Sequence, residues 1–262
     1  MMKSAIWVAA AVACLVAVPA MAQTDIDQGA VPGLANIDIV PCRVHNFDQE
    51  RADAAVRDKA FDLMKAHNLA ELTRMLPDLQ TALAHAPDVA PAIEHCGDKL
   101  NVYTDDIGRY LIVTAATTKQ KISGVNGTVM FPILPYARIA WETGWIYYEQ
   151  HDVVRALPMF EKGLLNNPHD AVVAGEYAND LEQDGQNAKA LALVDQFLAD
   201  NPALSKPEHA MMLRRRGYAL GELGRYDDAI AAYTQSLTDM PNNAMALNEI
   251  TYNKRQKALH VN

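Results

Sequence analysis

The residues best suited to chemistry in this 262-residue sequence are two cysteines with a histidine near each. Cys42 is followed by His45, and Cys96 is preceded by His95. Two sulfurs and two imidazole nitrogens form a common zinc ligand set, although adjacent ligands such as His95 and Cys96 fit a tetrahedron poorly. In an oxidising compartment, a cysteine pair is first interpreted as a disulfide. We therefore predict a Cys42–Cys96 disulfide, with a metal site as the open alternative.

Signatures of catalysis are missing from the sequence. It contains no G-x-S-x-G, H-E-x-x-H, P-loop or G-x-G-x-x-G motif. The eight histidines are scattered, and most fall where turns or helix ends are expected. We therefore expect a protein that is not an enzyme and that uses no cofactor.

Residues 1–22 have the pattern of a secretory signal peptide. Lys3 precedes an apolar run over 5–18, and Ala20-Met21-Ala22 forms a small-x-small cleavage site before Gln23. No later stretch has the length of apolar residues that a membrane span needs. We expect an exported, periplasmic protein whose mature chain has no integral membrane segment.

The charge balance narrows the class of partner. Without residues 1–22 the chain keeps 22 basic and 32 acidic residues, a net charge of −10. A protein that binds nucleic acid normally has a basic face, and the only basic run here is Arg214-Arg215-Arg216. Nucleic acid is therefore not an expected partner. We expect the basic run to be a solvated face from which Arg216 leans inward.

From Ala137 onward the sequence repeats with a period of 34 residues, in blocks 137–170, 171–204 and 210–243. In each block, positions 4, 7, 8 and 11 form one stripe of an amphipathic first helix, although position 7 departs from the apolar pattern with Thr143, Tyr177 and Arg216. Proline near the end of the block stops the second helix. The positions that recur as small residues or proline are 8 (Gly144, Ala178, Gly217), 20 (Ala156, Ala190, Ala229) and 32 (Pro168, Pro202, Pro241).

These blocks resemble the tetratricopeptide repeat family, most closely over "GRYDDAIAAYTQSLTDMPNN", residues 224–243. The resemblance implies an all-α fold, a solenoid of stacked helical hairpins that serves as an interaction scaffold. Residues 244–262 would supply a capping helix, in which Leu247 and Ile250 pack on the array while Lys254 is solvated.

The region 23–136 is predicted to be mainly helical and to contain the disulfide. Residues 23–46 are expected to be extended. Apolar periodicity predicts helices over 48–66, 68–85 and about 102–118. Asn126-Gly127 favours a small β-hairpin, with a plain loop as the alternative.

The resemblance also implies a binding face, because in this family positions 2, 5, 9, 12 and 13 of each first helix line a concave groove. In the first block the stretch "WETGWIYYEQ" puts Trp141, Trp145 and Tyr148 there as an aromatic stripe. The groove residues that we predict are Arg138, Trp141, Trp145, Tyr148, Glu149, Asn179, Glu182, Gln183, Arg214, Tyr218 and Glu222.

The leading hypothesis is an exported scaffold or adaptor that binds a peptide or protein segment in this groove. In a second hypothesis, residues 99–136 fold back and fill the groove, so that another surface binds the partner. A third class is a receptor for a small molecule or glycan, because planar sugar faces also stack on tryptophan.

Overall fold

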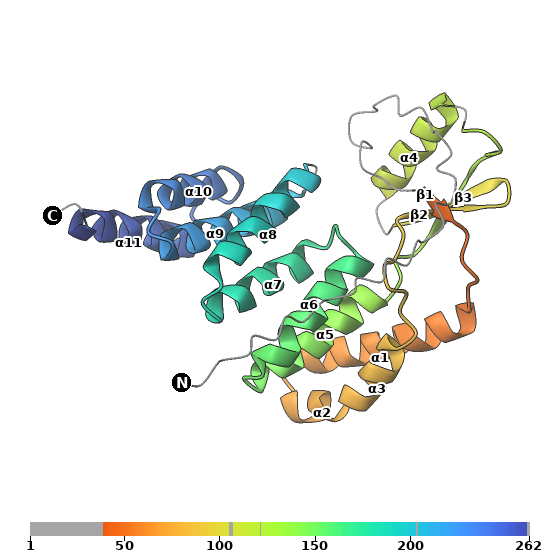
Figure 1. Cartoon of the computed structure of the whole chain (residues 1–262), viewed down its shortest axis with the longest axis horizontal. Coiled ribbons are helices and arrows are strands. Elements are labelled where there is room, and N and C mark those ends of the chain that lie inside the picture. Colours follow the sequence, from red (N-terminus) through yellow and green to blue (C-terminus); the bar gives the residue numbers. More distant parts are fainter. Residues whose placement is uncertain (1–38, 105–106, 121, 203, 261–262) are drawn as a thin grey trace, which may run out of the picture.

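The computed structural model describes residues 39–104, 107–120, 122–202 and 204–260. The predicted signal peptide, residues 1–22, lies outside these ranges, as does 23–38, the first part of the segment expected to be extended. The described chain has a small sheet with one helix at one end, followed by a long row of packed helices that ends at the C-terminal helix α11 (Figure 1).

The predicted repeats form antiparallel helix pairs. Each pair consists of a first helix, which we call the A helix, and a second, the B helix. The helices are α5 (Tyr136–Glu149), α6 (Val153–Asn166), α7 (Ala171–Gln183), α8 (Asn187–Asp200), α9 (Lys206–Glu222), α10 (Tyr226–Asp239) and α11 (Ala244–His260). The A helices are α5, α7, α9 and α11, and from α5 to α11 each helix packs on the next one along the chain.

The small residues at position 8 let the helices of a pair approach closely. A Cβ atom added to Gly217 would lie 2.8 Å from the ring of Tyr233, and one added to Gly144 would lie 3.0 Å from the ring of Phe160. The large residue in each contact occupies position 24 of the same block. The repeat pattern thus reflects helix packing, because a large side chain at position 8 would push the two helices apart.

The C-terminal helix caps the array with a different stripe from the one predicted. Ala246 and Asn253 are buried, and Ile250 between them packs on the last hydrophobic cluster. Leu247, expected to pack, is 48% exposed. The prediction for Leu247 was therefore wrong. Positions 3 and 10, held here by Ala246 and Asn253, are buried in all four A helices, whereas position 4 is buried in α5, α7 and α9 and exposed in α11.

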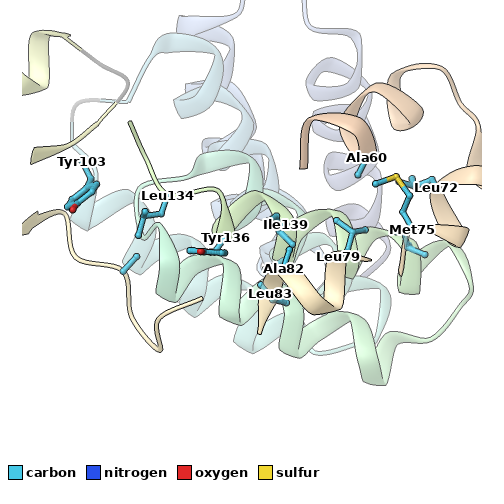
Figure 2. Packing of buried hydrophobic residues seen from close by; sticks show 13 residues of the cluster. Ala60, Leu72, Met75, Leu79, Ala82, Leu83, Tyr103, Leu134, Tyr136 and Ile139 are labelled. Atoms are coloured by element: carbon cyan, nitrogen blue, oxygen red, sulfur yellow. The ribbon is translucent and has the colours of Figure 1, made fainter. Parts of the chain in front are cut away.

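Residues 47–83 form a further helical hairpin ahead of the repeats: α1 (Phe47–Lys65), α2 (Leu69–Arg74) and α3 (Leu76–Leu83). The second predicted helix, 68–85, is broken at Met75, where Pro77 lies in the first turn of α3 and cannot donate a backbone hydrogen bond. Figure 2 shows Leu79 and Leu83 of α3 directed toward Ile139 of α5. The hairpin therefore packs on α5 as an additional repeat would.

The sheet is four-stranded with the order β1 (Ile39–Pro41), β2 (Ile93–Cys96), β3 (Lys99–Tyr103) and β4 (Thr128–Phe131). β4 pairs in parallel with β3, so the predicted hairpin at Asn126-Gly127 was wrong. The antiparallel hairpin joins β2 to β3 through Gly97, which has a φ of 63°. The helix predicted from about 102 starts later, as α4 (Ile107–Gln120), because residues up to Tyr103 belong to β3.

A Cys42–Cys96 disulfide joins the segment after β1 to the end of β2, as predicted, with a Cα–Cα distance of 4.7 Å. The alternative zinc site is contradicted, because the two sulfurs are bonded to each other. His45 instead bonds Glu94, with 2.9 Å between Nε2 and Oε2. Burial alone would raise the pKa of Glu94, but hydrogen bonds from His45, Arg43 and Tyr103 hold it below its usual value.

Candidate partner-binding face

The side chains predicted to bind a partner lie on the surface that the A helices share, which we call the inner face. Its first part, on α5, is called the closed end, and its remainder, on α7, α9 and α11, the open end. The two ends differ in what covers them, because α1, α2 and α3 pack on α5.

At the closed end, the aromatic stripe is largely interior. Trp141 is 8% exposed, and its ring lies 6.5 Å from that of Phe61 on α1, measured between centroids. Trp145 is half-buried and packs against the hydrophobic cluster that includes Leu63 and Met64 of α1. The residues that cover this part of the groove are therefore 47–83, not the segment 99–136 of our second hypothesis.

A shallow pocket of about 300 Å³ remains between α1, α2 and α5. Trp145 and Glu149 line it together with His67, Leu69 and other residues of the helical hairpin. Tyr148, the residue before Glu149, is half-buried, whereas Glu149 is exposed. The aromatic stripe therefore keeps only a small solvent-facing part.

Of two charged residues on α5, Arg138 is paired within the chain and Glu142 is buried. Arg138 pairs with Asp170, at 2.8 Å between Nε and Oδ2, and its guanidinium lies 5.5 Å from the ring centre of Trp141. Glu142 is 1% exposed, and burial raises its pKa to about 9 despite the opposing effect of Arg57 and Arg138. At neutral pH this carboxyl is therefore mostly protonated.

The open end is a polar face organised around Arg215 of α9. Its Nη1 donates to Asn179 Oδ1 at 2.8 Å and lies 3.3 Å from Glu182 Oε2, both on α7. Arg216, expected to lean inward, pairs with Asp195 of the neighbouring helix α8 at 2.6 Å. Arg214, Arg215 and Arg216 are all half-buried, so the run is less solvated than we expected.

The remaining predicted residues of this end keep different amounts of exposed surface. Tyr218 and Arg214 are half-buried, Glu182 is buried, and Gln183 and Glu222 are exposed. Tyr252 of α11 occupies the same repeat position as Tyr218 and is 48% exposed. Hence Asn179, Tyr218 and Tyr252 form a row at position 9 of three successive A helices.

The prediction missed position 6 of the repeat, which holds a charged residue in every A helix. These residues are Glu142, Glu176, Arg215 and Glu249. The periodicity itself was the signal that would have found them, because an amphipathic helix rarely keeps a charge at a fixed position that faces a packed neighbour.

Burial shapes the electrostatics of the open end. It raises the pKa of Asp180 to about 7, and the neighbouring Glu176 adds to that rise. It raises the pKa of Glu182 to about 7 as well, with Arg215 acting in the opposite direction. Burial, followed by Glu222, raises the pKa of Glu249. The surroundings of these three acids therefore disfavour their ionised forms.

Comparisons with known proteins agree with this fold. A tetratricopeptide repeat family model matches residues 177–244. Comparison with curated protein sequences gives no match. A solved structure of Pseudomonas aeruginosa pilF is 12% identical with a TM-score of 0.54, covering 82% of this chain and 72% of that one.

Two further structures have lower TM-scores. The first TPR domain of Spaghetti (RPAP3), bound to the HSP90 peptide SRMEEVD, is 24% identical with a TM-score of 0.42, and covers 47% of this chain and 93% of that one. MamA AMB-1 is 19% identical with a TM-score of 0.48, and the match covers 78% of this chain and 89% of that one. The family match over residues 177–244 supports the tetratricopeptide repeat assignment that the sequence pattern predicted. Within the described residues, no helix combines the length and the apolar character needed to cross a membrane.

Proposed function

We propose that this protein is a non-enzymatic scaffold that binds an extended peptide or protein segment along the open end of its inner face. The observation that carries the proposal is the row of side chains at position 9. Tyr252 is exposed, and Asn179 and Tyr218 are half-buried with neighbours from the array itself, whereas their half-buried counterpart Trp145 packs against the α1–α3 hairpin.

The composition of this row suits a partner with both apolar and polar contacts. Tyrosine presents a large ring with few rotamers to lose and carries a hydroxyl group, and it is enriched at protein interfaces. The amide of Asn179 can bond a peptide backbone. The helices that pack on α7, α9 and α11 are members of the array, so a partner can lie across their inner face.

Selection from a peptide-display library tests the proposal, with the purified chain as bait. Recovered peptides should lose at least about tenfold in affinity for the double variant Asn179→Ala/Tyr218→Ala, a change of about 1.4 kcal/mol. They should keep their affinity for Gln196→Ala, an exposed residue on the B helix α8. Failure to recover any peptide, or equal binding to both variants, would refute binding at the open end.

We also propose that the protein is exported to the periplasm of a bacterial cell envelope. The support is the signal-peptide pattern of residues 1–22, together with a disulfide that requires an oxidising compartment to persist. N-terminal sequencing of protein recovered from a periplasmic extract should begin at Gln23. An intact leader on protein found only in the cytosolic fraction would contradict export.

A further inference from the structure

The open end carries an excess of negative charge drawn from three A helices. Its carboxylates are Glu176, Asp180 and Glu182 on α7, Glu222 on α9 and Glu249 on α11. Its cations are Arg214 and Arg215 of α9 and the exposed Arg255 of α11. Five acids therefore face three arginines within this surface.

The arginines do not neutralise these carboxylates. Arg215 is shared between Asn179 and Glu182, and Arg216 is committed to Asp195 on the B helix α8. Arg214 Nη1 is buried and has no hydrogen-bond partner among the described residues. The single arginine–carboxylate contact of this surface is thus the one between Arg215 and Glu182, at 3.3 Å.

Two buried carboxyl groups of α7 each keep an oxygen without a partner in the described part of the chain. These atoms are Asp180 Oδ2 and Glu182 Oε1, in residues that are 1% and 5% exposed. A buried polar atom normally has a hydrogen-bond partner, and leaving one unpaired costs free energy. Two buried carboxylate oxygens of this surface therefore lack a donor, and its negative charges outnumber its positive ones.

Three of the carboxylates act electrostatically on Tyr218, and one of them, Glu222, lies one helical turn further along α9. After burial, the groups that raise the pKa of Tyr218 are Glu222, Glu182 and Glu249, followed by Tyr252 of the next A helix. An aromatic ring attracts a cation to its face, and a long aliphatic stem packs on apolar surface while its charged head reaches a carboxylate. Tyrosines among carboxylates are therefore suited to a lysine or arginine side chain.

We propose that the open end recognises a cationic partner segment, with a lysine or arginine side chain lying over Tyr218 among Glu182, Glu222 and Glu249. This inference rests on the proposed function and specifies the chemistry of its partner. The cationic group of the partner would pair with the carboxylates that Arg215 does not contact.

The test uses three capped, fluorescently labelled peptides of equal length with alternating Lys-Ala, Gln-Ala or Glu-Ala sequence, measured by fluorescence anisotropy. The Lys-Ala peptide should bind at least about tenfold more tightly than the Gln-Ala peptide, and added salt should reduce that preference. The Glu-Ala peptide should bind most weakly. Equal or tighter binding of the neutral or acidic peptide would overturn the inference.

A matched pair of double variants distinguishes binding at the open end from nonspecific electrostatic attraction to an acidic protein. Glu182→Gln/Glu249→Gln should abolish the preference for Lys-Ala. Glu161→Gln/Asp200→Asn makes the same change in charge at exposed positions on the B helices α6 and α8, and should preserve it. An equal loss in both variants would overturn the inference. Circular dichroism confirms that each variant is folded.

A dependence on pH gives a second readout. Protonation of Asp180 and Glu182, whose pKa values are both about 7, removes negative charge from the surface. Affinity for the Lys-Ala peptide should therefore rise between about pH 6 and pH 8, above the range of ordinary carboxylates. If display selection yields neutral or acidic peptides, the proposed function stands but this inference is contradicted. If selection yields no peptide, both are contradicted.

Discussion

The closed and open ends of the inner face are built from the same repeat but have opposite environments. At the closed end, position 5 holds Trp141, which is 8% exposed beneath α1. At the open end, position 9 of α11 holds Tyr252, which is 48% exposed. The difference arises from the α1–α3 hairpin, which packs on the first A helix and on none of the later ones to a comparable extent.

This comparison shows that aromatic residues on a repeat face have two distinct uses. Trp141 and Trp145 provide apolar area for joining the hairpin 47–83 to the array, and their hydrophobic clusters include Met64 of α1. Tyr218 and Tyr252 stand among carboxylates and keep surface for a partner. Each of the following predictions tests whether the two ends differ in this way, beginning with the largest expected effect.

Removing the Trp141 ring should strongly destabilise the protein. Trp141→Ala deletes a buried side chain between α1 and α5, and such changes cost about 3–5 kcal/mol. The free energy of unfolding measured in urea should fall by that amount. Trp141→Phe, which keeps a ring at the site, should lose much less. A loss of under about 1 kcal/mol for the alanine variant would show that the closed end is not a packed interior.

Removing the disulfide should weaken the closed end selectively. Cys42 lies shortly before α1, so the Cys42–Cys96 bond ties the start of the α1–α3 hairpin to the sheet. Loss of a native disulfide typically costs about 2–5 kcal/mol. In the double variant Cys42→Ser/Cys96→Ser, hydrogen exchange should accelerate in α1–α3 more than in α9 and α10. Uniform acceleration along the chain would contradict this distinction.

The pH dependence of stability should carry a contribution from Glu142. Its folded-state pKa of about 9 exceeds the ordinary value of 4.5. Between these values the folded state binds more protons than the unfolded state, so the contribution is fully present at low pH and is lost as pH rises. The slope within this window is at most about 1.4 kcal/mol per pH unit.

Glu142→Gln should flatten this slope, because a glutamine does not ionise. Melting temperatures measured from about pH 5 to pH 8 should therefore fall less in the variant than in the wild type. The exposed Glu161→Gln on α6 serves as the control and should keep the wild-type slope. Identical slopes in all three proteins would show that Glu142 is not buried between α1 and α5.

The smallest effect on stability is expected at the open end. Tyr252→Ala removes a ring that is 48% exposed, so the free energy of unfolding should change by no more than about 0.5 kcal/mol. The same variant should weaken binding of display-selected peptides by several-fold. A destabilisation as large as that of Trp141→Ala would remove the contrast between the two ends.

The sequence by itself determined the helical hairpins and their stacking. Small residues such as Gly144 and Gly217, and prolines at position 32, act within one block of 34 residues. Their consequences are local, since Gly217 meets Tyr233 of the same block. Caps are local as well: Asp152 and Asp170 accept hydrogen bonds from backbone groups two or three residues further on. The disulfide also followed from composition, because two cysteines remain outside the predicted leader.

Only the tertiary structure decided which part of the inner face is open. The contact that closes its first part joins residues far apart along the chain, as in the 3.1 Å hydrogen bond from Tyr136 of α5 to Asp53 of α1. The parallel pairing of β3 with β4 has the same non-local origin, and no turn signal encodes it. Trp141 and Tyr218 both lie on the same face of their A helices in the repeat pattern, so periodicity could not tell them apart. Their difference comes from a neighbouring hairpin that covers one tryptophan-bearing helix and leaves the tyrosine-bearing helices to solvent.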